Sequence, residues 1–291
     1  MKYLSANEQY KQRFGRKMYK ASVSLDVTCP NRDGKKGYGG CIFCSAGGSG
    51  EFSSSASKCI TDQINDAIAL VSRKAGKDAG YIAYFQSFTN TYCPADHLRC
   101  ALEEAADHPD VYALSVATRP DCLPDEMISM LSEMNEKIPV YIELGLQTSS
   151  DETGELINRC YRTEEFRDAV SRLRDKGIYT IAHVICGLPG EGEKEFLDTV
   201  RYAAHSGVDG IKFTCLYVLR GTKLEEMYDR GQISLLSMEG YFDIIEKALA
   251  VIPENVAVHR LTGDGPKKLL IAPMWTADKR RVINYINRRF G

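Results

Sequence analysis

Short apolar runs alternate with amphipathic helical segments along this chain, and the alternation restricts its possible folds more than any other feature. Between the runs, apolar residues recur at helical spacing near residues 61–74, 95–106, 124–135, 163–176, 191–206 and 238–251. Strand-like runs interleaved with helices predict an α/β protein with a parallel sheet. Right-handed crossovers would curl that sheet into a partial (βα)6 TIM-like barrel. The runs are Ala21–Val27, Tyr81–Phe85, Val111–Val116, Val140–Leu146, Ile178–Ile185 and Gly210–Tyr217.

The chain has 291 residues, of which 44% are hydrophobic, so it is long enough for one large domain with a substantial core. We expect a basic N-terminal segment at 1–20, the barrel at 21–255, and a C-terminal helical extension at 256–291 that packs on the barrel. The start of the chain has no apolar leader, and no run approaches the length of about 18 apolar residues that suggests a membrane span. We therefore expect a cytoplasmic protein without a membrane partner.

The first apolar run leads into a glycine-rich loop that holds three cysteines. The loop, residues 28–44, reads TCPNRDGKKGYGGCIFC and contains Cys29, Cys41 and Cys44. Three thiols cannot all pair as disulfides among themselves, and cysteine clusters in a reducing compartment bind metal more often than they cross-link a fold. Phe43 precedes the last cysteine and offers a flat aromatic face to a ligand. The loop is therefore a candidate metal or cluster site.

The number of cysteines separates different kinds of metal site. Iron–sulfur clusters of electron carriers take four cysteine ligands, so three cysteines leave one iron open to a substrate or cosubstrate. Structural zinc is closed by four ligands, whereas catalytic zinc keeps a free position. On the cysteines alone, a zinc knuckle is an equal alternative. The seven other cysteines are scattered along the chain and are expected to be small buried or partly buried thiols.

In parallel α/β barrels, functional residues come from the carboxyl ends of the strands. The second run ends in QSFTNTY, where Gln86 and Asn90 supply amide groups suited to an amino-acid moiety. The same segment also fits an ordinary capping turn. The third run ends near Thr118 and leads into the next helix, where Asp125 is expected as the N-cap. Thr61 is expected as the N-cap of an earlier helix.

The fourth run ends in ELGLQ, which places Glu143 and Gln147 on one face of a strand because they are four residues apart. A carboxylate inside an apolar barrel is costly unless it has a partner. We therefore expect Glu143 to serve a ligand or a salt bridge, with Arg159 as its candidate partner. The fifth run ends in HVICGLPGE, in which His183 fits either a hydrogen-bonded core position or a functional one. Glu191 is expected in the first turn of the next helix.

These segments resemble the radical S-adenosylmethionine (SAM) superfamily, in order along the chain as well as in type. That superfamily has a three-cysteine loop after the first strand of a partial barrel, with an aromatic residue before the last cysteine. The eleven residues between Cys29 and Cys41 exceed the usual gap and are similar to the branch related to the Elongator catalytic subunit. The segments KFTCLYVLRGTKLEEMY (212–228) and VHRLTGDGPKKLLIAP (258–273) resemble the bacterial family labelled YhcC or YtqA.

The resemblance implies the cofactors and the site. Cys29, Cys41 and Cys44 would hold a [4Fe–4S] cluster whose open iron chelates SAM. Reduction of the cluster by a flavodoxin or ferredoxin would then split SAM into methionine and a 5′-deoxyadenosyl radical. A barrel capped by loops gives such a radical a closed, dry cavity. The SAM contacts implied by the resemblance are Phe43, Gln86, Asn90, Thr118, Glu143, Gln147, Arg159 and Leu216.

Charge is distributed unevenly along the chain, although its net charge is only −2. Residues 1–20 carry six Lys or Arg against one Glu, and residues 259–291 carry eight against two Asp, so the two ends have charges of +5 and +6. If the ends meet in space, they form a positive surface suited to phosphates. The alternative is that these charges are the solvated face of a terminal helix.

The resemblance implies a radical SAM enzyme that modifies the C5 side chain of wobble uridine in tRNA, with tRNA as the partner. A radical SAM enzyme acting on a small metabolite and a zinc-stapled, non-enzymatic binding module are the alternatives. The sequence assigns no catalytic proton donor or radical relay. The polar or redox-active residues near the strand ends are Tyr92, Cys93, Asp121, His183 and Tyr217, and each also fits a structural role.

Overall fold

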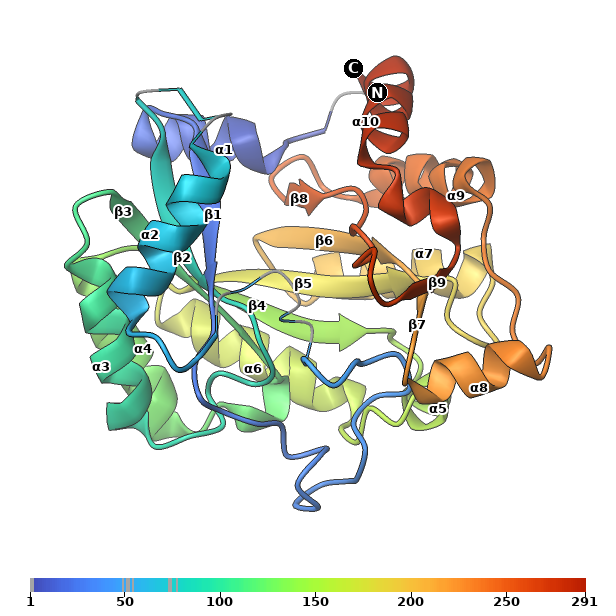
Figure 1. The fold of residues 1–291 in the computed structure, drawn as a ribbon, viewed down its shortest axis with the longest axis horizontal. Helices are drawn as coiled ribbons and strands as arrows, with labels where there is room; N and C mark the ends of the chain where they lie inside the picture. The colour runs from blue at the N-terminus through green and yellow to red at the C-terminus, as the bar shows by residue number, and fades with distance from the viewer. Residues whose placement is uncertain (1–2, 49, 51–52, 54, 73–74, 77) are drawn as a thin grey trace.

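The computed structural model describes residues 3–291 except 49, 51–52, 54, 73–74 and 77, and its main sheet has the strand order β1-β2-β3-β4-β5-β6-β8 (Figure 1). All neighbouring strands in this sheet are parallel. The sheet curls into a half-barrel, which confirms the predicted partial α/β barrel, but it has seven strands rather than six. The strands are β1 (Met18–Val23), β2 (Gly80–Phe85), β3 (Val111–Thr118), β4 (Val140–Gln147), β5 (Tyr179–Cys186), β6 (Gly210–Cys215) and β8 (Ala257–Arg260).

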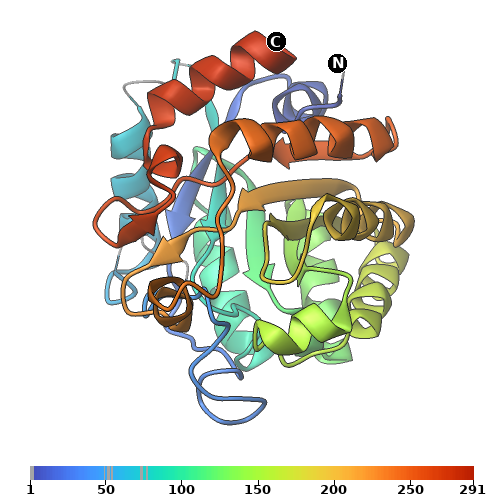
Figure 2. The same ribbon diagram turned by 90° about the vertical axis from the view of Figure 1, so that its right-hand side faces the viewer.

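Helices lie between successive strands and cover the convex side of the sheet, as Figures 1 and 2 show together. The helices that connect β2 through β6 follow the predicted segments closely, because their apolar stripes are long and regular. The helices after the cysteine loop are α2 (Ile60–Val71), α3 (Ala95–Ala106), α4 (Asp125–Lys137), α5 (Asp151–Leu156), α6 (Thr163–Asp175), α7 (Glu193–His205), α8 (Lys223–Asp229), α9 (Met238–Val251) and α10 (Lys279–Phe290).

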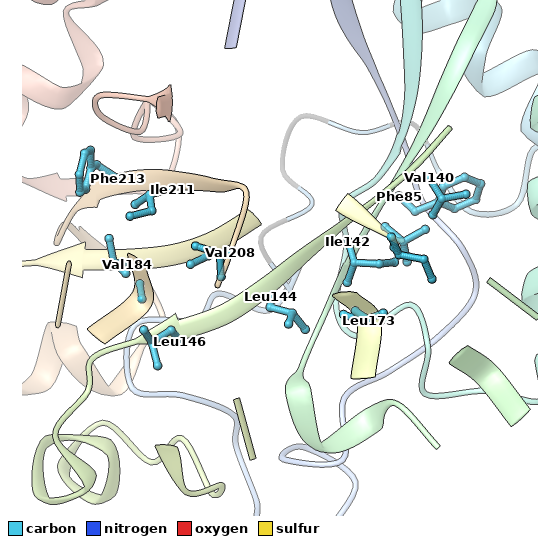
Figure 3. Packing of buried hydrophobic residues seen from close by; sticks show 14 of the residues in the cluster. Phe85, Val140, Ile142, Leu144, Leu146, Leu173, Val184, Val208, Ile211 and Phe213 are labelled. Atoms are coloured by element: carbon cyan, nitrogen blue, oxygen red, sulfur yellow. The ribbon is translucent and has the colours of Figure 1, made fainter. Parts of the chain in front are cut away.

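The main core lies between the sheet and these helices. Alternate residues of β4, namely Val140, Ile142, Leu144 and Leu146, are fully buried and belong to this core (Figure 3). Side chains alternate between the two faces of a strand, so the residues between them point into the barrel. The β4 residues that face the barrel interior are therefore Tyr141 and Glu143, followed by Gly145 and Gln147 at the carboxyl end.

Several predicted boundaries were wrong for local reasons. The first strand is Met18–Val23 rather than Ala21–Val27, because the chain leaves the sheet at Ser24, whose N–H bonds to the Gln63 Oε1 atom at 2.7 Å. Thr61 is not an N-cap, since α2 begins at Ile60.

Two acidic residues also differ from their predicted positions at helix starts. Asp125 is the first residue of α4 rather than its cap, and its carboxylate lies 2.5 Å from Arg172. Glu191 precedes α7 rather than lying in its first turn, and it accepts a hydrogen bond from the Thr148 hydroxyl.

The two ends of the chain meet on one side of the barrel. The N-terminal helix α1 (Ala6–Phe14) packs Tyr10 against Tyr141 at a ring distance of 5.9 Å, and Ser5 bridges to Val258. Strand β8 comes from the segment expected as a C-terminal extension, yet it pairs with β6 and so belongs to the sheet. A short antiparallel pair, β7 (Val218–Leu219) and β9 (Leu270–Ala272), lies outside the main sheet.

Among the helices of the described residues, none combines the length and the apolar character that a membrane span requires.

Candidate functional site

One cavity of about 570 Å³ lies inside the half-barrel, where the cysteine loop meets the carboxyl ends of the strands. Its volume is within the range of small-molecule and cofactor sites. The structure brings most of the residues predicted from the sequence to this one cavity. Those that line it are Cys29, Cys41, Cys44, Phe43, Gln86, Thr118, Glu143, Gln147 and Leu216.

The cysteine loop is held by hydrogen bonds that fix its backbone. The N–H of Arg32 donates to Cys29 O at 2.8 Å, and that of Cys44 donates to Cys41 O at 2.9 Å, so each cysteine end of the loop is a tight turn. Ile42 N–H donates to Ile157 O at 3.1 Å and ties the loop to the segment after α5. Asn31, within the loop, is fully buried, and its amide nitrogen lies 3.8 Å from the Cys41 sulfur.

Gly37 is required at one close approach in this loop. A Cβ atom at Gly37 would lie 2.3 Å from Asn31 Oδ1 and 2.9 Å from the Cys160 sulfur. Both distances are shorter than real side chains allow, so only glycine lets the loop fold over Asn31.

The chemistry of the three thiols fits a cluster. Burial, together with the nearby Cys44 and Cys29, raises the pKa of the Cys41 thiol to about 12. Neighbouring thiolates repel one another unless a cation lies among them, and iron in a cluster would provide that charge. In the part of the chain that the structure describes, no group of three or more His, Cys, Asp or Glu side chains is placed so that it could hold a metal ion. The three cysteines line the wall of the cavity, where a cluster would present a face to a second ligand.

The segment after β2 places its two predicted residues differently. Gln86 lines the cavity, and its N–H donates to Val23 O at 3.2 Å. Asn90 does not line the cavity. Its amide nitrogen donates to Phe85 O and Ala117 O, both at 2.9 Å, so the side chain ties the ends of β2 and β3 together.

Glu143 is fully buried, and its partners differ from the prediction. Its carboxylate pairs with Lys20 and lies 2.6 Å from both Lys212 Nζ and His183 Nε2. Ser115 donates a further hydrogen bond at 2.9 Å. The expected pairing with Arg159 is wrong, because the partners of Glu143 come from other strands of the sheet, β1, β3, β5 and β6, rather than from the following element.

Arg159 is also fully buried, but in a separate place. Its guanidinium donates to Leu146 O at 2.8 Å and to Thr148 O at 2.6 Å, and it pairs with Asp151 at 3.0 Å. It does not line the cavity. Through these contacts Arg159 stabilises the loop after β4.

Arg119 is the arginine that reaches the cavity instead, and the sequence analysis missed it. It follows β3, pairs with Asp121 at 2.9 Å, and donates to Arg159 O at 3.0 Å. The signal was present in the motif TRPD directly after the third strand. Arg119 and Asp121 were recognisable as opposite charges at a strand end, which is where functional residues of such barrels lie, and this was a reason to predict Arg119 as a site residue.

The residues named as nearby polar candidates fall into two groups. His183 and Tyr217 line the cavity. Tyr92, Cys93 and Asp121 line a different recess, which also contains Pro30. Burial and the positive Lys212 hold the pKa of His183 well below its usual range, so this histidine is neutral at pH 7 and accepts or donates hydrogen bonds without carrying charge.

An open parallel half-barrel with three cysteines in the loop after its first strand, and with polar residues at the other strand ends, has the architecture of radical SAM enzymes. The comparison with family models agrees. The model of the Radical SAM superfamily matches residues 29–203, and the model of the Radical SAM C-terminal domain matches residues 208–290. The chain belongs to the radical SAM superfamily, whose members use a [4Fe–4S] cluster and SAM.

Relatives cover nearly the whole chain. It is 40% identical to YtqA of Bacillus subtilis over 99% of this chain and 89% of that protein, and 32% identical to YhcC of Escherichia coli over 92% and 85%. It is 28% identical to a tRNA uridine(34) acetyltransferase of Methanocaldococcus jannaschii, over 58% of this chain and 31% of that protein.

Solved structures share the fold. The archaeal Elp3 of Methanocaldococcus infernus has a TM-score of 0.68 at 17% identity, over 94% of this chain and 63% of that one. Coproporphyrinogen III oxidase (HemN) from Escherichia coli has a TM-score of 0.51 at 18% identity, over 83% and 54%.

The close approach of Gly145 to Gln147 allows a test of whether Gln147 contacts SAM. A Cβ atom there would lie 2.6 Å from Gln147 Nε2, the mobile end of a flexible side chain. We expect Gly145→Ala to displace Gln147 and to weaken SAM binding by about 5- to 30-fold, since one hydrogen bond is worth roughly 1 to 2 kcal/mol. Calorimetry of the cluster-containing protein with SAM measures this change. A variant with unchanged SAM affinity would remove Gln147 from the SAM site.

Proposed function

We propose that this protein is a radical SAM enzyme that modifies the C5 side chain of wobble uridine in tRNA. The relative that acts on tRNA uridine 34 supports this substrate, although the match covers only about a third of that protein. In the structure, the observation that carries the proposal is a basic helix that begins at the SAM-type cavity. Lys279, the first residue of α10, lines the cavity itself.

The cavity residues have distinct roles in this proposal. When bound, the cluster supplies the electron that cleaves SAM. Cys29, Cys41 and Cys44 would hold it, and Phe43, which lines the same cavity, would shield it from water. Gln86, Thr118 and Gln147 orient SAM by hydrogen bonds, and Leu216 packs against its apolar part. The contacts of Asn90 and Arg159 make them supports for this site rather than direct ligands of SAM.

Arg119 takes the role of the cationic contact in the proposal. Its side chain lines the cavity, whereas that of Arg159 does not. An arginine presents several donors in a fixed plane and suits a carboxylate. The SAM carboxylate is therefore its proposed partner.

The C-terminal helix α10 is the proposed contact for the tRNA backbone. Arg280, Arg281 and Arg288 line a surface recess beside this helix. Arg281 pairs with Glu239 at 3.7 Å, whereas Arg289 is engaged by Asp243 and Glu246. Arg280 and Arg288 have no ion pair among the described residues, so they are free to contact phosphates.

Salt dependence tests this contact. Each arginine that neutralises a phosphate contributes about 0.7 to 0.9 to the slope of log K against log salt concentration. We expect the double variant Arg280→Gln, Arg288→Gln to reduce that slope by about 1.5 for bulk tRNA. Lys247→Gln, which removes an exposed charge paired with Glu193 at 2.7 Å, is the control and should keep the slope. Equal slopes for all three proteins would place the tRNA contact elsewhere.

Nucleoside analysis tests the proposed reaction in the cell. Deletion of the gene should change the wobble nucleosides of bulk tRNA, as measured by mass spectrometry, and a plasmid copy should restore them. Unchanged wobble nucleosides would contradict the proposal and favour a small-metabolite substrate. The proposed setting is the cytoplasm, where tRNA and a flavodoxin or ferredoxin electron donor are present.

A further inference from the structure

All seven strands of the half-barrel contribute a polar side chain to one ring inside it. These side chains are Lys20 (β1), Tyr84 (β2), Ser115 (β3), Glu143 (β4), His183 (β5), Lys212 (β6) and Arg260 (β8). The interior of a closed barrel of this type is filled mainly by branched apolar residues. Burying charged groups is costly unless they serve a partner. The ring is therefore a candidate binding surface.

Positive charge exceeds negative charge in this ring. Lys20, Lys212 and Arg260 are three basic side chains and Glu143 is the one acidic side chain of the ring, so basic groups exceed acidic ones by two. Arg260 donates to Phe213 O at 3.2 Å and to the Thr214 hydroxyl at 2.5 Å, both neutral partners.

The other charged groups that line the cavity are Arg32, Arg119, Lys279 and Asp264, and they do not compensate for this excess. Lys279 and Asp264 pair with each other at 2.7 Å. His183 and His259 are neutral, because burial and the surrounding lysines hold the pKa of each well below its usual range.

The lysines show the effect of the unbalanced charge. Burial lowers the pKa of Lys20, and so do the neighbouring Lys212 and Arg260. The pKa of Lys212 is about 8, lowered chiefly by burial. An anion placed among these side chains would relieve the repulsion and favour their charged forms.

The ring lies deeper in the barrel than Gln86 and Gln147, which are proposed to orient SAM. On β2, Tyr84 comes two residues before Gln86, and on β4, Glu143 comes four residues before Gln147. Below the ring, α1 closes the barrel. Tyr10 of α1 and Tyr179 of β5 each place their hydroxyl 3.2 Å from an imidazole nitrogen of His259. A substrate group that reaches the ring must therefore enter from the carboxyl ends of the strands and pass the residues proposed to bind SAM.

We propose that Lys20, Lys212 and Arg260 form an anion-binding subsite at the floor of the cavity, which takes a carboxylate or phosphate group of the substrate. Glu143 positions the two lysines by pairing with both. Lys212 Nζ also donates a hydrogen bond to the Tyr84 hydroxyl at 3.1 Å. The subsite follows from the geometry of the ring. That its anion belongs to a uridine derivative rests on the function proposed above.

Binding of defined probes tests the subsite. The full-length protein, with its cluster reconstituted and with SAM present, is titrated anaerobically with uridine, 5-carboxymethyluridine, uridine 5′-monophosphate, glutarate and inorganic phosphate. We expect at least one anionic probe to bind tightly, and Lys212→Met to weaken it about 10- to 100-fold, as expected for loss of a hydrogen bond between charged groups. The two anionic uridine derivatives distinguish a carboxylate on the base from a nucleotide phosphate.

Controls separate loss of the subsite from loss of the fold. Lys247→Gln should bind every probe as the wild type does, and Arg260→Gln should behave like Lys212→Met. A damaged fold would weaken uridine and the anionic probes alike, whereas loss of the subsite removes only the preference for the anion.

The remaining outcomes are also distinct. If glutarate or phosphate binds in a Lys212-dependent way but no uridine derivative does, the subsite stands and the tRNA proposal fails. If charged and neutral probes bind equally, the subsite is refuted. It is also refuted if Lys212→Met weakens SAM rather than the probes, because the ring would then hold the SAM carboxylate.

Discussion

Replacing Cys41 with alanine should remove almost all of the iron from anaerobically purified protein, from about four atoms per chain to less than about one, because two thiolates do not hold a cubane cluster. The broad absorbance near 400 nm and the formation of 5′-deoxyadenosine should disappear with it. Cys29→Ala and Cys44→Ala should behave in the same way. Iron analysis, the visible spectrum and chromatography of the SAM products measure these three effects.

Cys59→Ala and Cys100→Ala are the matched controls for this prediction. Both cysteines are exposed, so the expectation of a buried or partly buried thiol is wrong for these two. Both also lie outside the loop, so both variants should keep the iron content and activity of the wild type. A Cys41→Ala protein that retains about four irons per chain would mean that other residues hold the cluster. One zinc per chain in the wild type, without iron, would favour the zinc-stapled module.

Replacing Arg159 with methionine should lower the free energy of unfolding by about 3 to 5 kcal/mol, the range for removing one partner of a buried ion pair. The substitution removes the guanidinium donor from the carbonyls of Leu146 and Thr148, and Leu146 O keeps the Thr148 N–H at 2.8 Å. It also leaves Asp151 without its buried partner. Urea denaturation of wild type and variant under anaerobic conditions measures the difference.

Arg162→Met is the control, because Arg162 pairs with the same Asp151 at 3.5 Å but from an exposed position. Its unfolding free energy should change by less than about 0.5 kcal/mol. If Arg159→Met instead keeps its stability and loses SAM affinity, Arg159 contacts SAM directly. The role proposed for Arg119 would then be wrong.

The sheet was predictable from sequence because parallel strands buried on both faces are nearly continuous apolar runs, and the helices between them have regular apolar stripes. The exception is β8, which has only four residues, Ala257–Arg260, and two of those are polar. So short a segment has no period to detect. Its place in the sheet depends on pairing with β6, which is a tertiary contact.

The cysteine loop and the strand-end residues were predictable because parallel strands bring their carboxyl ends together. The partners of Glu143 were not. Lys20 and Lys212 are far from Glu143 in sequence and reach it only through the stagger and curl of the sheet. Arg159 was misassigned for the same reason, since a sequence shows that a charged residue follows a strand but not which way its side chain turns.

The most direct test of the account is to reduce the cluster-containing protein anaerobically in the presence of SAM, with and without bulk tRNA from a strain that lacks the gene. The account predicts 5′-deoxyadenosine and methionine as products, with more 5′-deoxyadenosine when that tRNA is present. Protein that holds about four irons per chain yet forms no 5′-deoxyadenosine under either condition would contradict it.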